Sequence, residues 1–309
     1  MQALVDQYLQ HLGVERQLSP HTTSAYRRDL ALLTEHAQKQ NITDAAQLRE
    51  FHIRQLVASL HGKGLSGRSL QRILSAWRQF FSWLASQRKI DSNPVAAIRA
   101  PKSPRKLPRT LDVDQMNQLL SIEGDSWLEK RDHAMLELFY SSGLRLAELA
   151  GLDLTALNLD EGLVRVLGKG SKARIVPVGR VAIIALRTWL AVRNENLPAT
   201  SAKPETAVFI GQQGKRLGAR AIQLRLRHYS LKQGMAEPVH PHMLRHAFAS
   251  HVLESSSDLR AVQELLGHAN ISTTQIYTHL DFQHLARVYD AAHPRAQKKP
   301  QTNNEVADE

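Results

Sequence analysis

The stretch of the chain from His240 to Tyr277 gathers side chains that can handle a phosphate group. Imidazoles transfer protons, a guanidinium binds two phosphate oxygens at once, and a tyrosine hydroxyl can attack phosphorus. Of the 15 histidines in the chain, eight lie between His240 and His293, so their clustering needs an explanation. Two kinds of site would explain it, namely a metal site or a metal-free site for phosphoryl transfer.

A metal site explains these residues poorly. His240 and His242 have the H-x-H spacing of some zinc ligands, but the stretch contains no H-E-x-x-H motif. Arg145 and Arg245 would repel a cation if they lie at the same site. The chain has no cysteine, which excludes disulfides, thiolate catalysis and cysteine-ligated zinc. The residues therefore favour a site that uses no metal and no cofactor.

His242 and Arg245 are three residues apart at the start of a predicted helix, so both are expected on one helix face. Arg245 can bind two non-bridging oxygens of a phosphate, and His242 can donate a hydrogen bond to the phosphate or transfer a proton. The other face of the helix is apolar and is predicted to be buried through Leu244, Phe248 and Val252.

Tyr277 is the candidate nucleophile. Ser272 or Thr273 can cap a helix that places Tyr277 in its first turns. A tyrosine is a poor nucleophile at neutral pH because its pKa is about 10. Clustered cations would favour the phenolate. The arginines of the predicted site, and His268 nine residues upstream, therefore favour a nucleophilic role for Tyr277 over a purely structural one.

Two further cations come from earlier in the chain. Arg145 follows Gly143 in a break between two predicted helices, and Glu148, three residues later, can orient it. Lys169 lies between two glycines in a predicted β-hairpin turn, which can deliver an ammonium group that protonates a leaving oxygen.

The G-K-G-S turn around Lys169 also resembles a phosphate-binding loop. It lacks the G-x-x-x-x-G-K-[ST] spacing and joins two predicted strands rather than a strand and a helix, so no nucleotide site is predicted. Lys172 and Arg174 are close to Lys169, and chemistry alone does not choose the proton donor among the three.

These residues belong to a predicted catalytic domain over residues 111–292, which is mainly helical with a small antiparallel sheet. The expected elements are helices at 112–121 and 128–142, strands at 163–167, 174–178 and 207–210, and helices from 219 onward with breaks at Pro238, Gly267 and Pro294. The polar residues 293–309 are predicted to form a disordered tail.

Residues 1–92 predict an all-α domain with helices at 2–13, 20–38, 44–60 and 66–89. The last helix has a wide apolar stripe, whose aromatic residues are expected in the core rather than stacked on bases: Trp77, Phe80 and Phe81. The opposite face of this helix and that of the helix at 20–38 carry arginines suited to DNA phosphates: Arg27, Arg28, Arg68, Arg72 and Arg78.

The positive charge lies mostly in the first third of the chain. Residues 1–110 carry 17 Lys and Arg against 7 Asp and Glu, a net of +10, whereas the rest carries 23 against 22, a net of +1. Such a basic domain is typical of a protein that binds a polyanion. The Pro-rich linker, residues 93–110, either only tethers the domains or also crosses DNA through Lys102, Arg105 and Lys106. Lys172 and Arg174 are further candidates for DNA contact.

No segment of the chain predicts a membrane or secretory role. The apolar runs are too short to cross a bilayer, and the N-terminus lacks the apolar core of a signal peptide. A cytoplasmic protein is therefore expected, and the basic first domain favours its association with the nucleoid.

The motifs taken together resemble the signature of the tyrosine recombinases, the phage integrase family. They are G-L-R-x-x-E-L, G-K-G in a hairpin, H-P-H-x-L-R-H, L-L-G-H and T-x-I-Y, in the family's order, and the resemblance covers the whole chain. It implies a helical core-binding domain and an α-rich catalytic domain that close as a C-shaped clamp around DNA. It also implies six site residues: Arg145, Lys169, His242, Arg245, His268 and Tyr277.

The resemblance implies strand cleavage without ATP or metal. Tyr277 would attack the scissile phosphate and form a 3′-phosphotyrosyl link with a free 5′-hydroxyl. Arg145 and Arg245 would bind the non-bridging oxygens as negative charge builds on them. Proton transfer and support of the phosphate would fall to the other three site residues.

Within the family, the chain length and the block ELLGHANISTTQIYTHLDFQHL resemble the bacterial Xer recombinases. That resemblance implies a XerD partner. Two copies of this chain and two of XerD would assemble on two double-stranded DNA segments at a dif site. The DNA translocase FtsK would control the reaction, which resolves chromosome dimers at cell division. The helix at 282–292 would pack on its own domain or on a neighbouring subunit, and the family favours the neighbour.

Several alternatives remain open at the level of sequence. A XerD-type protein and a phage or transposon integrase would share the same family and chemistry. A type IB topoisomerase would use similar chemistry but reseal the same strand. A non-enzymatic protein would bind DNA without forming a covalent adduct.

Overall fold

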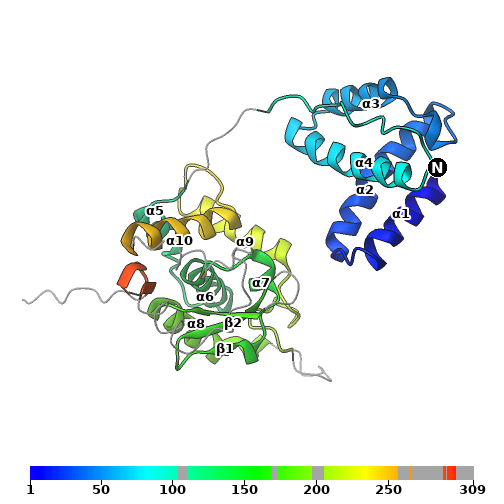
Figure 1. Cartoon of the computed structure of the whole chain (residues 1–309). Coiled ribbons are helices and arrows are strands. Elements are labelled where there is room, and N and C mark those ends of the chain that lie inside the picture. Colours follow the sequence, from blue (N-terminus) through cyan, green and yellow to red (C-terminus); the bar gives the residue numbers. More distant parts are fainter. Residues whose placement is uncertain are drawn as a thin grey trace, which may run out of the picture. The chain divides into compact units, whose positions relative to one another are not determined.

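The computed structural model describes residues 1–103, 110–168, 173–196, 205–256, 265, 288, 289 and 291–296, apart from the side chains of His21 and Asn196. The chain forms two compact units, Met1–Leu107 and Pro108–Glu309, each with its own apolar core (Figure 1). Over the described ranges, no helix combines the length and the apolar composition that a membrane span requires.

The first unit is built from helices. Its elements are α1 (Gln2–Val14), α2 (Pro20–Lys39), the 3-10 turn η1 (Ala45–Gln47), α3 (Glu50–Gly62) and α4 (Gly67–Ser86). Ser19 and Ser66 cap α2 and α4, and each hydroxyl accepts a hydrogen bond from the backbone N–H three residues later at 3.2 Å. The helix predicted over 44–60 starts later, because Asp44 caps the separate turn η1 and Arg49 is the N-cap of α3.

The aromatic side chains of α4 lie in the core, as predicted, and are fully buried: Trp77, Phe80 and Phe81. The segment after α4 packs on the same unit, since Val95 and Ile98 are buried in this core. Arg78 in α4 donates to the carbonyl of Ile98 at 3.0 Å. The packed part of the first unit therefore extends into residues 93–98, which the sequence places in the linker.

The second unit surrounds a central buried helix, α6 (Trp127–Ser142), with a small sheet and further helices (Figure 1). These helices are α5 (Val113–Leu120), α7 (Leu146–Ala150), α8 (Arg180–Val192), α9 (Ala219–Lys232) and α10 (Pro241–Ser256), with 3-10 turns η2 (Leu154–Ala156) and η4 (Arg193–Asn196). The strands β1 (Leu157–Asn158), β2 (Leu163–Leu167) and β3 (Ala173–Pro177) form an antiparallel sheet in that order. The predicted fold class, mainly helical with a small antiparallel sheet in the second domain, is confirmed.

The third strand predicted over 207–210 is wrong. Ala207 and Ile210 make only isolated bridges, and β1 completes the sheet instead. The run is buried as an apolar segment, but side chains take its carbonyls. The carbonyl of Ala207 accepts from Arg193 at 3.0 Å, and that of Val208 accepts from Trp189 at 2.9 Å. These contacts replace the ladder that a strand would form.

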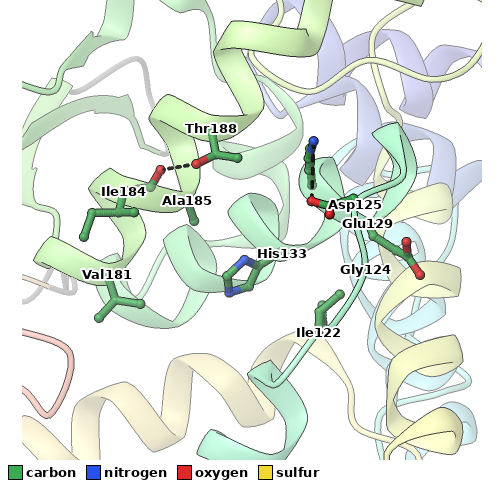
Figure 2. Close-up of a pocket in the computed structure, with 10 residues that line it drawn as sticks. Ile122, Gly124, Asp125, Glu129, His133, Val181, Ile184, Ala185 and Thr188 are labelled. Atoms are coloured by element: carbon green, nitrogen blue, oxygen red, sulfur yellow. Dashed lines mark hydrogen bonds and ion pairs between the residues drawn. The ribbon is translucent and has the colours of Figure 1, made fainter.

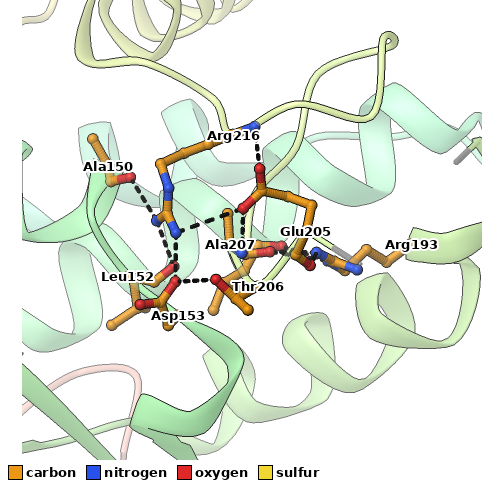
Figure 3. A network of polar contacts seen from close by, with 9 residues as sticks. Ala150, Leu152, Asp153, Arg193, Glu205, Thr206, Ala207 and Arg216 are labelled. Atoms are coloured by element: carbon orange, nitrogen blue, oxygen red, sulfur yellow. Dashed lines mark hydrogen bonds and ion pairs between the residues drawn. The ribbon is translucent and has the colours of Figure 1, made fainter. Parts of the chain in front are cut away.

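Arg216 fastens the segment 205–217 to the end of α7 (Figure 3). Its guanidinium donates to the carbonyls of Ala150 at 3.3 Å and Leu152 at 3.2 Å. It also forms ion pairs with Asp153 and Glu205. Since the last carbonyls of a helix have no partner within the helix, this contact fixes α7 at its C-terminal end.

The described residues near the C-terminus pack on their own unit. Tyr289 is fully buried, and its hydroxyl shares a 2.7 Å hydrogen bond with Ser141 in α6. His293 and Ala296 are buried as well, so the core extends past residue 292, where the sequence places the start of a tail. For these residues, burial in their own core argues against docking on a neighbouring subunit. Residues 297–309 lie outside the described residues.

The buried imidazole of His293 predicts a loss of stability in mild acid. Burial, and to a smaller degree the nearby His251 and Arg295, lower the pKa of His293 from 6.5 to about 3. As the pH is lowered, the imidazole is protonated in the unfolded chain before it is protonated in the folded protein. The free energy of unfolding therefore decreases as the pH drops below 6.5, and the loss is about 1.4 kcal/mol at pH 5.5. Urea unfolding at pH 7.5 and pH 5.5 measures the difference.

The matched variant is His293→Asn, which keeps an acceptor for the backbone N–H of Arg295, now bonded to Nδ1 at 3.1 Å. This part of the pH dependence should be absent from the variant. The same pH dependence in both proteins would show that another group causes it.

Candidate active site

Arg145 is held at the start of α7 by reciprocal contacts with Glu148. Helix α6 ends at Gly143, whose left-handed backbone (φ 54°) turns the chain, and Arg145 is the N-cap of α7. The backbone N–H of Arg145 donates to Oε2 of Glu148 at 2.7 Å, and its guanidinium Nη1 donates to Oε1 at 2.9 Å. Glu148 therefore orients Arg145, in agreement with their spacing.

Glu148 is almost completely buried, with 3% of its side chain exposed, and it binds a second arginine. Arg174 in β3 donates through Nη1 to Oε1 at 2.6 Å and through Nη2 to Oε2 at 2.8 Å. Burial raises the pKa of Glu148, but the hydrogen bonds from Arg174 and Arg145 outweigh burial, so the pKa lies below its ordinary value. Glu148 is therefore charged at neutral pH.

Helix α10 carries His242 and Arg245 three residues apart. Its apolar face is buried as predicted, through Leu244, Phe248 and Val252. His242 is exposed in the first turn, whereas Arg245 is partly buried and donates through Nη1 to the carbonyl of Gly143. This hydrogen bond ties α10 to the turn that carries Arg145.

Guanidiniums from three parts of the chain meet at this turn and form, with Glu148, what we call the arginine cluster: Arg145, Arg174 and Arg245. Burial, together with nearby Arg145 and Arg174, lowers the pKa of Arg245 to about 10, against the opposing effect of Glu148. The four side chains carry a net charge of +2, from three guanidiniums and one carboxylate. Positive charge held in this way suits a phosphate dianion or diester.

Lys169, His268 and Tyr277, which are predicted for the same site, lie outside the described residues. Described residues close in sequence to Lys169 and His268 border the arginine cluster. Leu265, three residues before His268, accepts a hydrogen bond from Arg174, and the paired strands β2 and β3 precede and follow Lys169 in the sequence. Within the part of the chain that the structure describes, no three His, Asp or Glu side chains are grouped so as to hold a metal.

The candidate DNA contacts are placed differently. Exposed on the first unit are Arg27, Arg28, Arg68, Arg72 and Lys102. Outside the described residues are Arg105, Lys106 and Lys172. Arg78 is partly buried by its contact with the carbonyl of Ile98. For Arg174 the predicted DNA contact is corrected, because its side chain is only 8% exposed and its guanidinium is bound to Glu148.

The burial of Arg174 follows from the strand register. Strands β2 and β3 pair Val166 with Arg174 and Val164 with Val176, and these alternate residues share one face of the sheet. That face is buried, since the three valines are at most 2% exposed. The alternation in A-R-I-V-P was therefore the sequence signal that Arg174 points into the core.

Replacing Gly143 with alanine is expected to destabilise the second unit by about 2–4 kcal/mol. A left-handed backbone disfavours a side chain, and a Cβ at this position would overlap the ring of Phe248 in α10. Urea unfolding measures the loss. Gly211→Ala is the matched control, since its Cβ would meet only the carbonyl of Lys215 at an ordinary 3.8 Å. Equal stability of the two variants would contradict this account of the turn.

A groove of about 220 Å³ lies between α8 and the N-terminal half of α6 (Figure 2). Its lining combines apolar and charged side chains, among them Ile122, Asp125, His133, Val181 and Ile184. None of the members of the arginine cluster lines it. The groove is therefore separate from the candidate active site.

The sequence matches two family models. Residues 109–284 match the model of the phage integrase family, and residues 5–88 match that of the phage integrase N-terminal SAM-like domain. The chain is 54% identical over 305 residues to the tyrosine recombinase XerC of Xanthomonas axonopodis pv. citri, with 96% of this chain and 98% of that protein covered. It is 56% identical over 302 residues to the tyrosine recombinase XerC of Pseudomonas aeruginosa, with 97% of each covered.

Solved structures share this architecture. The XerH site-specific recombinase bound to a palindromic difH substrate, in a post-cleavage complex, is 25% identical with a TM-score of 0.65, over 88% of this chain and 80% of that chain. A lambda integrase dimer bound to a COC′ core site shares the fold at 19% identity, with a TM-score of 0.67 over 90% and 99% of the two chains. With a family model over more than half of its length and relatives above 50% identity, the chain belongs to the phage integrase family and is a site-specific tyrosine recombinase.

Proposed function

We propose that this recombinase cuts DNA by attack of Tyr277 on the scissile phosphate, which leaves a 3′-phosphotyrosyl link and a free 5′-hydroxyl. The observation that carries the proposal is the arginine cluster, in which Glu148 orients Arg145 and Arg245 is tied to the same turn through Gly143. Displacement at phosphorus builds negative charge on the non-bridging oxygens. Arg145 and Arg245 bind these oxygens and stabilise the charge.

Proton transfers balance the reaction. As the bond from Tyr277 Oη to phosphorus forms and the bond to the 5′-oxygen breaks, His242 accepts the tyrosine proton and Lys169 protonates the leaving oxygen. His268 donates a hydrogen bond to the phosphate. The 5′-hydroxyl of the partner strand then attacks the phosphotyrosine and releases the tyrosine, so the bond energy is retained without ATP or metal. The exposed position of His242, one turn before Arg245 on α10, supports this role.

We further propose that the chain acts as a XerC recombinase. Identity of 54% and 56% to XerC proteins over nearly the whole chain supports this role. Two copies of the chain and two of XerD would assemble on two DNA duplexes, and FtsK would control the exchange that resolves chromosome dimers at cell division. The neighbour XerH, bound to a difH substrate, supports a dif-like site. The reaction would take place on the nucleoid, in the cytoplasm.

The exposed cations of the first unit are proposed to bind DNA phosphates. Residues 1–110 carry a net charge of +10, and Arg27 and Arg28 are exposed on α2, as is Arg68 on α4. Contacts of this kind position a duplex without reading its sequence. They also make binding dependent on salt.

One experiment tests the proposed function. The protein is incubated with labelled dif DNA, with and without XerD, in excess EDTA and without ATP, and the peptide joined to the DNA 3′ end is mapped. The expected result is a phosphotyrosyl bond at Tyr277, with strand exchange only when XerD is present.

Each other outcome identifies an alternative. Strand exchange without XerD would indicate an integrase that acts alone, and relaxation of plasmids without a dif site would indicate a topoisomerase. Inhibition by EDTA would restore the metal alternative. Binding with no adduct would contradict the proposal.

A further inference from the structure

Arg174 contacts two segments that are far apart in the sequence, and each carries one of the family motifs. It lies in β3, which follows the G-K-G motif in the sequence. Its two Nη atoms bind both carboxylate oxygens of Glu148, which in turn holds the backbone and the guanidinium of Arg145. Its Nε donates to the carbonyl of Leu265 at 3.4 Å, in the L-L-G-H motif.

We propose that Arg174 is a positioning residue of the cleavage reaction, which fixes Arg145, the hairpin of Lys169 and the segment of His268 relative to one another. This inference rests on the proposed function, because it takes these three as catalytic residues. Arg174 itself touches neither DNA nor the reacting phosphate, and it acts through the residues it holds.

The contacts of Arg174 require the shape of a guanidinium. Its planar fork presents N–H groups in fixed directions, so both oxygens of Glu148 and a backbone carbonyl are bound at once. A lysine ammonium is a point charge that lacks this geometry. Since the side chains of Arg174 and Glu148 are 8% and 3% exposed, water would not readily replace a lost donor.

The surroundings of Arg174 show that packing alone does not call for an arginine. It shares its face of the sheet with Val164, Val166 and Val176, all buried. A buried ion pair is often no more stabilising than apolar side chains of similar volume. We therefore attribute this ion pair to the active site and not to the stability of the core. In an active site, an error of about 1 Å in the position of a reacting group costs about 100-fold in rate.

The test compares Arg174→Lys and Arg174→Gln with the wild type on a nicked suicide dif substrate, in which cleavage is trapped as an adduct. We expect single-turnover cleavage at saturating DNA to fall about 100-fold in both variants. The DNA Kd should stay within about threefold, and its salt dependence should not change. Arg187→Lys is the matched control, because Arg187 is exposed and pairs with exposed Asp160 at 2.7 Å.

Three outcomes would overturn the inference. Cleavage within about threefold of wild type would show that the position of Arg174 does not matter. A weaker Kd with a salt slope reduced by about one would instead assign Arg174 to a phosphate contact. A wild type that forms no adduct at Tyr277 would sink the proposed function, and this inference with it, whereas slow variants of an active wild type support both.

A double variant separates positioning from folding. Glu148→Gln combined with Arg174→Met removes both members of the buried ion pair and leaves the net charge of the cluster at +2, so its melting temperature should recover most of the loss seen in Arg174→Gln. Cleavage, measured well below the melting temperature of each protein, should stay about 100-fold slow. Recovery of cleavage together with stability would show that Arg174 only supports the fold, and would overturn the proposal.

Discussion

Replacing Tyr277 with phenylalanine is expected to abolish covalent protein–DNA adducts completely, because phenylalanine has no oxygen to attack the phosphate. DNA binding should weaken by no more than about fivefold, since one lost hydrogen bond is worth about 1 kcal/mol. The measurement is a denaturing gel of the protein on a nicked suicide substrate, beside a binding titration of the same DNA.

The other five tyrosines of the six in the chain are unsuited to the attack. Burial raises the pKa of four of them above the ordinary value of 10: Tyr8, Tyr26, Tyr140 and Tyr229. A raised pKa leaves less phenolate at neutral pH and so makes attack on phosphorus slower. Tyr289 is fully buried and bonded to Ser141. These properties of the other five tyrosines support the proposal that Tyr277 is the nucleophile.

Tyr229→Phe is the matched control for Tyr277→Phe. Its hydroxyl accepts only a long 3.4 Å hydrogen bond from Arg225, and its ring is packed in the core of the second unit. This variant should form the adduct as the wild type does. An adduct that persists in Tyr277→Phe and disappears in Tyr229→Phe would overturn the assignment of the nucleophile.

Local features of the fold and site could be predicted from the sequence. Capping serines and apolar stripes at helical spacing define α2 and α4, and the glycine at 143 marks the end of α6. The three-residue spacings of Arg145 with Glu148 and of His242 with Arg245 hold because one helical turn determines them.

Features that depend on distant contacts could not be predicted in the same way. Helix α8 is a different case: it is absent from the expected elements, although the helical spacing of its buried residues Ala182, Ala185, Leu186 and Trp189 can be read from the sequence. The run 207–210 is apolar enough for a strand, but Arg193 and Trp189 take its carbonyls from another part of the chain. For Arg174, the alternation in A-R-I-V-P indicates a buried side chain, but its partner Glu148 comes from another part of the chain, and only the fold brings the two together.

Replacing Arg245 with glutamine is expected to slow single-turnover cleavage by about a thousandfold at saturating DNA. Removing one preorganised donor from a site that stabilises developing charge costs about 100- to 1,000-fold, and Arg245 supplies a full charge as well as hydrogen bonds. Its guanidinium is tied to the carbonyl of Gly143 and lies near Arg145, which the contacts with Glu148 hold in place. With its pKa lowered to about 10, Arg245 is still protonated at neutral pH.

Arg245→Lys separates charge from geometry. Lysine keeps the charge but cannot bind two phosphate oxygens side by side, so we expect it to recover only part of the lost rate. Arg187→Gln, at an exposed position, should cleave as the wild type does. If Arg245→Gln lost DNA affinity by the same factor as cleavage at low DNA, and cleaved normally at saturating DNA, Arg245 would bind the ground state and transition state equally. The arginine cluster would then hold the DNA without stabilising the charge that forms during cleavage.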